Sequence, residues 1–176
     1  MGTTRRVLVA VLAVVAGATT AAAAPPPGWE AWRYLLGEWS AVGSGRPGEA
    51  SGGFGFATDL EGGALVRRSH ADYPAAPGRP AAHHEDLMVL YREGSGSAAR
   101  ALYLDNEGHV IHYAAEASAG GTRWTFTSAA APAAPRYRFT YMKLTRDSLA
   151  MRFEIAPPGK PDSLATYLQG TARRRR

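Results

Sequence analysis

The sequence predicts an all-β protein: an antiparallel up-and-down β-barrel of about ten strands with one short helix near the N-terminus. Short runs that alternate between apolar and polar residues recur between residues 38 and 171, and turn-forming residues separate them. The 176 residues include 20 Gly and 12 Pro, which favours many turns over long helices. A meander of this length has two exposed edges unless it closes on itself, and closure produces a barrel.

The first 24 residues have the pattern of a signal peptide. Arg5 and Arg6 provide a positive start, and residues 7–18 are apolar but shorter than the ~20 residues that span a bilayer. Small residues then allow cleavage after Ala23. Residues 4–8 also resemble a twin-arginine signal. We expect a periplasmic or secreted protein with no stable membrane insertion after cleavage.

The only convincing helix lies at the start of the mature chain. Residues 25–28 form a Pro-rich linker, and residues 28–36 place Trp29, Trp32 and Leu36 on one face of an α-helix. Gly37 is a plausible stop for this helix. We expect the barrel domain at residues 29–171 and a basic tail at residues 172–176.

The strands follow in a regular order. Asp105 to Gly108 is the best hairpin turn, because Gly supplies the positive φ that tight turns need. Residues 73–82 and 129–135 are loops rich in Pro and Ala, and residues 157–161 exclude a strand. The expected strands are 38–43, 53–60, 64–72, 85–92, 100–104, 109–116, 122–127, 137–143, 149–155 and 164–171.

Composition excludes several kinds of function. The chain has no Cys, so it has no disulfides, no thiolate nucleophile and no Cys-ligated metal site. It has 20 Lys and Arg against 15 Asp and Glu, but six of these basic residues are arginines at the two ends, which leaves 14 against 15 elsewhere. A nearly neutral barrel does not favour nucleic-acid binding.

One short helix followed by about ten antiparallel strands resembles the calycin group, which includes lipocalins, fatty-acid-binding proteins and nitrobindin-like barrels. Residues 35–43, Leu-Leu-Gly-Glu-Trp-Ser-Ala-Val-Gly, resemble the opening strand of nitrobindin-like and related exported bacterial barrels, with Ala41 where those often have Gly. Residues 84–91 and 105–113 resemble the same exported bacterial group, whose function is unassigned.

The resemblance implies an internal cavity for a small apolar or amphipathic molecule. It also implies that Trp39 closes one end of the barrel, with Trp29 and Trp32 in support. Nitrobindins bind haem through a His near the C-terminal end, whereas the last His here is His112, and we expect no cofactor.

Several polar residues are candidates for the cavity wall. Arg67 and Arg68 are adjacent in a strand, so one of them should face inward, where it needs a carboxylate from the protein or from a ligand. His70 shares a strand face with Arg68. The predicted ligand-binding residues are Trp39, Arg68, His70, Tyr91, His112 and Tyr141.

No catalytic or metal-binding residues are predicted. His83 and His84 point to opposite faces of a strand, as do Glu85 and Asp86, which suits neither chelation nor a glycosidase pair. No Gly-x-Ser-x-Gly motif is present.

The sequence therefore favours an exported lipocalin-like barrel that binds a small apolar or amphipathic ligand in its cavity. The alternatives are a haem-binding or cofactor-free enzyme that uses the same cavity, and a filled barrel that acts through surface contacts. The sequence leaves the oligomeric state open.

Overall fold

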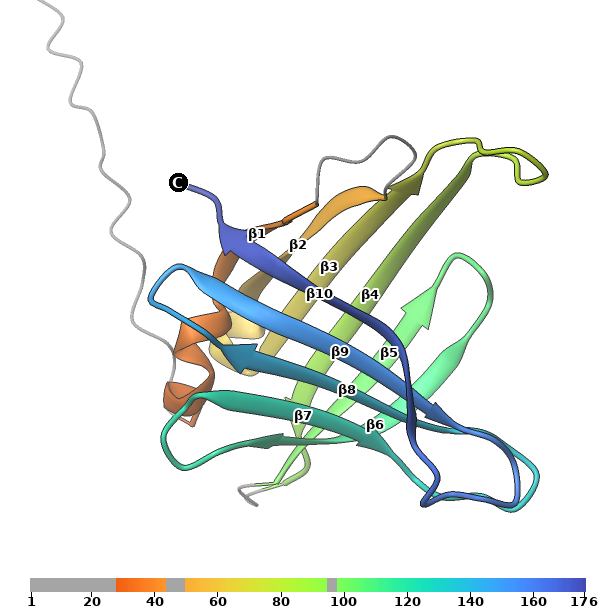
Figure 1. Ribbon diagram of the computed structural model, residues 1–176. Coiled ribbons are helices and arrows are strands. Elements are labelled where there is room, and N and C mark those ends of the chain that lie inside the picture. Colours follow the sequence, from red (N-terminus) through yellow and green to blue (C-terminus); the bar gives the residue numbers. More distant parts are fainter. Residues whose placement is uncertain (1–27, 44–49, 95–97) are drawn as a thin grey trace, which may run out of the picture.

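The structure is a computed structural model that describes residues 28–43, 50–94 and 98–176 (Figure 1). The predicted signal peptide and most of the Pro-rich linker lie outside these residues. Within them no helix is both long and apolar enough to cross a membrane.

The described residues form ten antiparallel strands that close into a barrel. Each strand pairs with its neighbours in the sequence, and β1 closes the barrel by pairing with β10, so the predicted up-and-down topology is confirmed. The observed strands begin and end within a few residues of the predicted ones. Their bounds are β1 Gly37–Ala41, β2 Ser51–Asp59, β3 Ala64–Tyr73, β4 Ala82–Arg92, β5 Ala99–Asp105, β6 Val110–Ala117, β7 Arg123–Ser128, β8 Arg136–Lys143, β9 Ser148–Ala156 and β10 Ala165–Arg174.

The predicted helix is a short 3₁₀-helix, η1 (Glu30–Leu35), rather than an α-helix. Trp29, Trp32 and Leu35 are spaced three residues apart, and all three are buried. A 3₁₀-helix has three residues per turn, so this spacing places them on one face. The prediction that Leu36 completes the buried face was therefore wrong by one residue, because it assumed the 3.6-residue period of an α-helix.

Four indole rings close the end of the barrel on which η1 lies, which we call the plugged end. Trp29 donates to the carbonyl of Gly62 (3.0 Å) in the second 3₁₀ turn, η2 (Leu60–Gly62). Trp124 donates to Ala31 (2.8 Å), and Trp39 to Leu35 (2.9 Å). Trp32 packs against the ring of Phe126. Backbone carbonyls accept from three of these indole N–H groups, so hydrogen bonds as well as packing fix the orientation of the rings. We call these four rings the plug.

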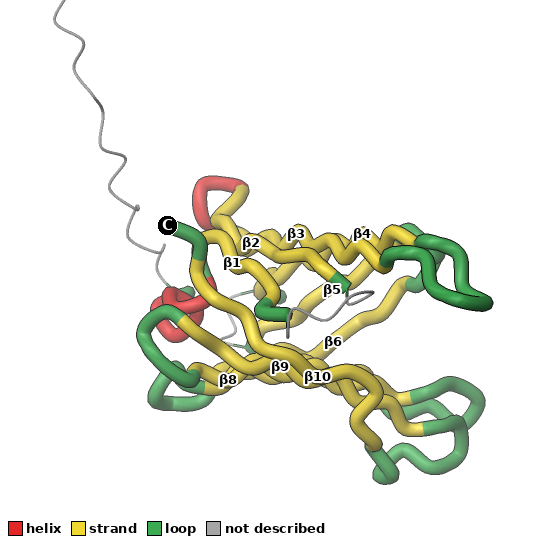
Figure 2. Tube along the Cα trace, turned by 45° about the horizontal axis from the view of Figure 1, so that its top comes forward, coloured by secondary structure: helices red, strands yellow, loops and turns green. Residues whose placement is uncertain are grey.

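The opposite end, which we call the mouth, carries the β3–β4, β5–β6, β7–β8 and β9–β10 hairpins (Figure 1). Figure 2 shows β3 and β4 diverging from β9 and β10 towards these hairpins. Inward-facing side chains are accordingly buried near the plug and half-buried towards the mouth. Tyr141 is buried, whereas Phe139 and Tyr137 on the same face of β8 are partly exposed.

The seam between β1 and β10 extends further than the sequence predicted. β10 continues to Arg174, so the segment assigned to a basic tail from residue 172 supplies the last part of the closing strand. The guanidinium of Arg174 lies over the ring of Trp39 and donates to the carbonyls of Leu36 (2.5 Å) and Tyr34 (2.6 Å). Arg174 thus ties the end of the chain to η1 and β1.

Candidate functional site

The register of β3 decides which of the two adjacent arginines enters the barrel. Arg67 pairs with Phe56 of β2 and with Met88 of β4, both of which are buried in the core. Paired residues on neighbouring strands share a face of the sheet, so Arg67 faces inward and Arg68 faces outward. The prediction that Arg68 lines the cavity was therefore wrong, and His70, on the same face as Arg68, is also exposed.

Arg67 is an almost fully buried arginine, with 6% of its surface exposed. Its Nη1 donates to Oδ1 of Asp86, which faces inward from β4. Its guanidinium also lies over the rings of Phe54 and Phe139, at 5.3 and 5.6 Å from the ring centroids. The carboxylate that an inward arginine requires is thus supplied by the protein itself.

Two buried polar atoms next to this ion pair have no hydrogen-bond partner among the described residues. They are Nε of Arg67 and the hydroxyl oxygen of Tyr141. The Tyr141 hydroxyl lies near the Arg67 guanidinium, and burial raises the pKa of this hydroxyl, so it stays protonated. An unsatisfied buried donor costs about 1–3 kcal/mol, so an oxygen acceptor at this point would stabilise the site.

An apolar wall leads from these atoms to the mouth. It consists of cross-strand pairs of β8 and β9, namely Tyr141 with Met151 and Phe139 with Phe153. Tyr137 stacks on Phe153 with ring centroids 5.9 Å apart. Apart from Tyr141, these side chains are half-buried although they face inward. They therefore leave apolar surface partly accessible towards the mouth of the barrel.

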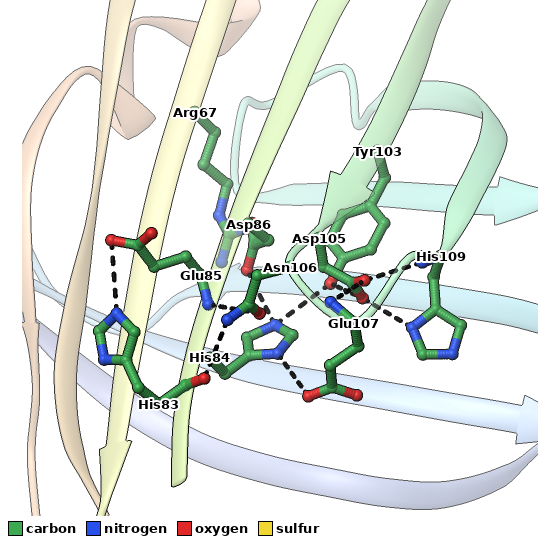
Figure 3. Close-up of polar contacts among 10 residues, drawn as sticks. All are labelled: Arg67, His83, His84, Glu85, Asp86, Tyr103, Asp105, Asn106, Glu107 and His109. Carbon is green, nitrogen blue, oxygen red and sulfur yellow. Dashed lines mark hydrogen bonds and ion pairs between the residues drawn. The ribbon is translucent and has the colours of Figure 1, made fainter.

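A hydrogen-bonded network occupies the opposite wall, on β4 and β5 (Figure 3). Nδ1 of His84 lies 3.0 Å from Glu107, and its Nε2 lies 3.3 Å from the Tyr103 hydroxyl and 3.5 Å from Asp86. Tyr103 also donates to Asp105 at 3.1 Å, and Nδ1 of His109 lies 2.8 Å from the same Asp105 oxygen. The network therefore connects the buried Arg67–Asp86 pair to exposed residues at the mouth.

The environment of this network keeps Tyr103 protonated and Asp105 ionised. Burial raises the pKa of Tyr103, and the nearby Asp86 and Asp105 carboxylates raise it further, so Tyr103 remains a donor. Burial works against ionisation of Asp105, but hydrogen bonds from the backbone N–H and ring of His109 and from Tyr103 hold its pKa below the usual value. The lining near Tyr103 thus carries carboxylates that are already bound to donors.

Asn106 anchors the β5–β6 hairpin, and with it this network, to β4. Its side-chain oxygen accepts from the N–H of Glu85, and its side-chain nitrogen donates to the carbonyl of His83, each at 3.0 Å. The amide side chain thus continues the backbone ladder beyond the last residue pair, Asp86 with Asp105. This holds Glu107 within reach of His84.

The remaining predicted site residues divide between the interior and the outer surface. Trp39 and Tyr141 are buried in the interior, Trp39 as part of the plug and Tyr141 beside Arg67. Tyr91 and His112 face outward, where both line a surface groove of about 490 Å³ over β4 to β8. The prediction that these two residues line the cavity was wrong. Their chain neighbours Leu90 and Tyr113 face the core, so Tyr91 and His112 face the other side of the sheet.

The predicted site residues did not include Arg67, Asp86 or Tyr103. The alternation of apolar residues along β4 and β5 did contain a clue to Asp86 and Tyr103. Asp86 is in phase with Met88 and Leu90, and Tyr103 is in phase with Ala101, all of which are buried. Asp86 and Tyr103 therefore continue the apolar face of their strands. The network itself could not be predicted, because it joins residues of β3, β4 and β5 through their register.

In the part of the chain that the structure describes, the side chains of this lining form no metal cluster, and His84 is already engaged at both ring nitrogens. Among the described residues, no group of three or more His, Asp or Glu side chains could hold a metal ion. His84 is the imidazole nearest the buried ion pair, and both of its ring nitrogens are engaged by Glu107, Tyr103 and Asp86. An axial haem ligand needs a ring nitrogen that is not otherwise bound.

No protein-family model matches the chain, and no curated protein shows significant similarity to it. The closed ten-stranded antiparallel barrel is compatible with a calycin-like fold.

Proposed function

We propose that this protein is an exported, calycin-like binding protein that holds a small amphipathic molecule in the open half of its barrel. The observation that carries this proposal is the pair of unsatisfied donors, Arg67 Nε and the Tyr141 hydroxyl, at the inner end of an apolar wall. The wall supplies surface for an apolar body, and the two buried donors would supply a polar contact once the side chains that cover them shift.

The charge of the site favours a neutral oxygen acceptor over a carboxylate. The positive charge of Arg67 is already matched by Asp86, and Asp105 and Glu107 add two further carboxylates nearby. A ligand carboxylate would meet this excess of negative charge at close range, in a partly buried site. A ketone, ester or alcohol oxygen would accept from Arg67 Nε or Tyr141 without that repulsion.

The proposal is tested by titrating the protein with two probes of equal chain length, a medium-chain methyl ketone and the matching fatty acid, and following tryptophan fluorescence and calorimetric heat. We expect the ketone to bind more tightly than the acid. Equal or tighter binding of the acid would contradict the neutral-ligand assignment, and binding of neither probe would contradict the proposed binding in the barrel.

Two adjacent arginines provide a matched pair of variants. Arg67→Met removes the inward guanidinium while keeping an apolar stem, and Arg68→Met changes an exposed residue on the other face of the same strand. We expect only the first to weaken ketone binding. Because Arg67→Met also leaves Asp86 without its partner, Tyr141→Phe is the milder probe: it removes one unsatisfied hydroxyl and should weaken binding about fivefold or more.

Native mass spectrometry of protein purified from its own periplasm addresses export and ligand together. Loss of residues 1–23 would confirm the predicted cleavage, and an added mass that is released on denaturation would identify the ligand. Recovery of the protein only from the cytoplasm and with residues 1–23 still attached would contradict export. That result would not affect the titration with the ketone and the fatty acid.

A further inference from the structure

One side of β10 is paired along only part of its length. On one side β9 pairs with it from Ala165 to Arg173, whereas on the other side β1 pairs with it only from Ala172 to Arg174. Among the described residues, no strand pairs with the second side of residues 165–170. We call this the open edge of β10, and Figure 1 shows it lying in front of the other strands.

The ladder shows which backbone groups face the open edge. The N–H of Val42 donates to the carbonyl of Thr171 at 2.9 Å, and the N–H of Arg175 donates to the carbonyl of Glu38 at 2.8 Å. Residues 171 and 175 therefore direct their backbone groups towards β1. Backbone groups alternate along an antiparallel strand, so Gln169 directs its N–H and C=O to the same side, beyond the end of β1.

The sequence of the open edge does not protect it from pairing. Residues 164–171 contain no charged residue and no Pro, the two devices that most often block edge strands. Tyr167 and Leu168 are 75% and 53% exposed, unusually high for large hydrophobic residues. A bulge between Thr166 and Leu168 bends the start of the strand, but Leu168 to Arg173 keep a regular register with β9.

We propose that the open edge of β10 pairs antiparallel with the same edge of a second copy of this chain, about a two-fold axis near Tyr167 and Leu168. Antiparallel pairing of identical edges is self-complementary and brings no like charges together within residues 164–171. The flanks are of opposite sign: Asp162, which is exposed although it lies 3.4 Å from Arg136, precedes the edge, and Arg173 follows it. Antiparallel pairing directs the Asp162 of each copy towards the Arg173 of the other.

The size of the edge sets the strength of the dimer. Six residues per copy, with Tyr167 and Leu168 as the apolar contacts, form a contact well below the ~1,600 Å² of a standard stable interface. The dimer is therefore weak and forms as the protein concentration rises. Because it rests on the strand edge alone, the inference does not depend on the ligand proposed above.

The test combines sedimentation equilibrium over a range of concentrations with hydrogen exchange of the amides of residues 165–171. We expect a monomer–dimer equilibrium in the wild type and slower exchange of these amides at high concentration. Gln169→Pro removes an N–H that faces the open edge and leaves the pairing with β9 intact, so it should weaken the dimer at least about tenfold. Gln169→Ala keeps the N–H and should dimerise like the wild type.

A second variant guards against misfolding of the proline variant. Tyr167→Lys changes an exposed side chain and brings two like charges together near the two-fold axis, so it should also favour the monomer. A monomer at every concentration would overturn the proposal, as would a dimer unaffected by Gln169→Pro and Tyr167→Lys. Protection of residues 165–171 that does not depend on concentration would also overturn it, since the edge would then be covered within one chain.

Discussion

At the scale of single residues, removing one partner of the Arg67–Asp86 ion pair should destabilise the fold more than replacing both partners with apolar residues. We expect Arg67→Met to lower the free energy of unfolding by about 3–5 kcal/mol, because it leaves the Asp86 carboxylate buried without its partner. The double variant Arg67→Met with Asp86→Leu should recover most of this loss, because neither charge then remains. Urea denaturation of the two single variants and the double variant measures the coupling energy.

A double variant no more stable than Arg67→Met would show that Arg67 stabilises the fold through its contacts with Phe54 and Phe139 rather than through Asp86. Arg68→Met serves as the control and should change stability by less than about 0.5 kcal/mol, because Arg68 is exposed.

At the scale of elements, the close approach of β1 and β2 requires a glycine at position 53. A Cβ on Gly53 would lie 2.5 Å from the carbonyl oxygen of Trp39, a contact that only a backbone shift can relieve. We expect Gly53→Ala to lower the free energy of unfolding by about 1–3 kcal/mol. Gly120→Ala is the matched control, because a Cβ there meets no atom within 4 Å. Equal melting temperatures for the two variants would contradict this account.

The pairing of β8 with β9 carries a pH-dependent contribution to stability. Arg138 binds Glu154 through two hydrogen bonds, of 2.7 and 2.8 Å, and these hold the pKa of Glu154 below its usual value despite its burial. A carboxylate with a lowered pKa in the folded state stabilises the protein at neutral pH. This stabilisation is lost as the pH falls below about 5 and through the folded-state pKa.

Glu154→Gln should therefore be less stable than the wild type at pH 7, by an amount on the order of 1 kcal/mol, and the two proteins should converge in acid. Chemical denaturation across this pH range measures the difference. A constant difference between the two proteins at every pH would show that Glu154 acts through packing rather than through its charge.

At the scale of the whole molecule, closure of the barrel depends on a short seam held by one arginine. Among the described residues, three residue pairs and the backbone bonds of Val42 to Thr171 and Arg175 to Glu38 join β1 to β10. Arg174 adds two side-chain hydrogen bonds, to η1 and the residue after it, and a contact with Trp39. We expect Arg174→Met to lower the free energy of unfolding by about 2–4 kcal/mol. Arg176→Met, which lies beyond the strand, should have no measurable effect on thermal unfolding. Equal losses in both variants would assign the effect to net charge.

The sequence by itself determined the fold class, the strand order and most of the strand bounds. Local patterns carry this information: alternation in segments such as residues 149–155, and the turn Asp105 to Gly108, act between neighbours in the chain. The resemblance further implied that Trp39 closes one end of the barrel with Trp29 and Trp32 in support, and all three are buried at the plugged end.

Only the tertiary structure decided which face of β3, β4 and β6 points inward, and hence that the interior arginine is Arg67 rather than Arg68. A strand with polar residues on both faces does not specify its own phase, and a shift of one residue exchanges the two faces. Pairing with Phe56 and Met88 on neighbouring strands makes that choice for β3. The unsatisfied atoms beside Asp86 and the unpaired edge of β10 likewise arise from contacts between distant residues, which no local pattern records.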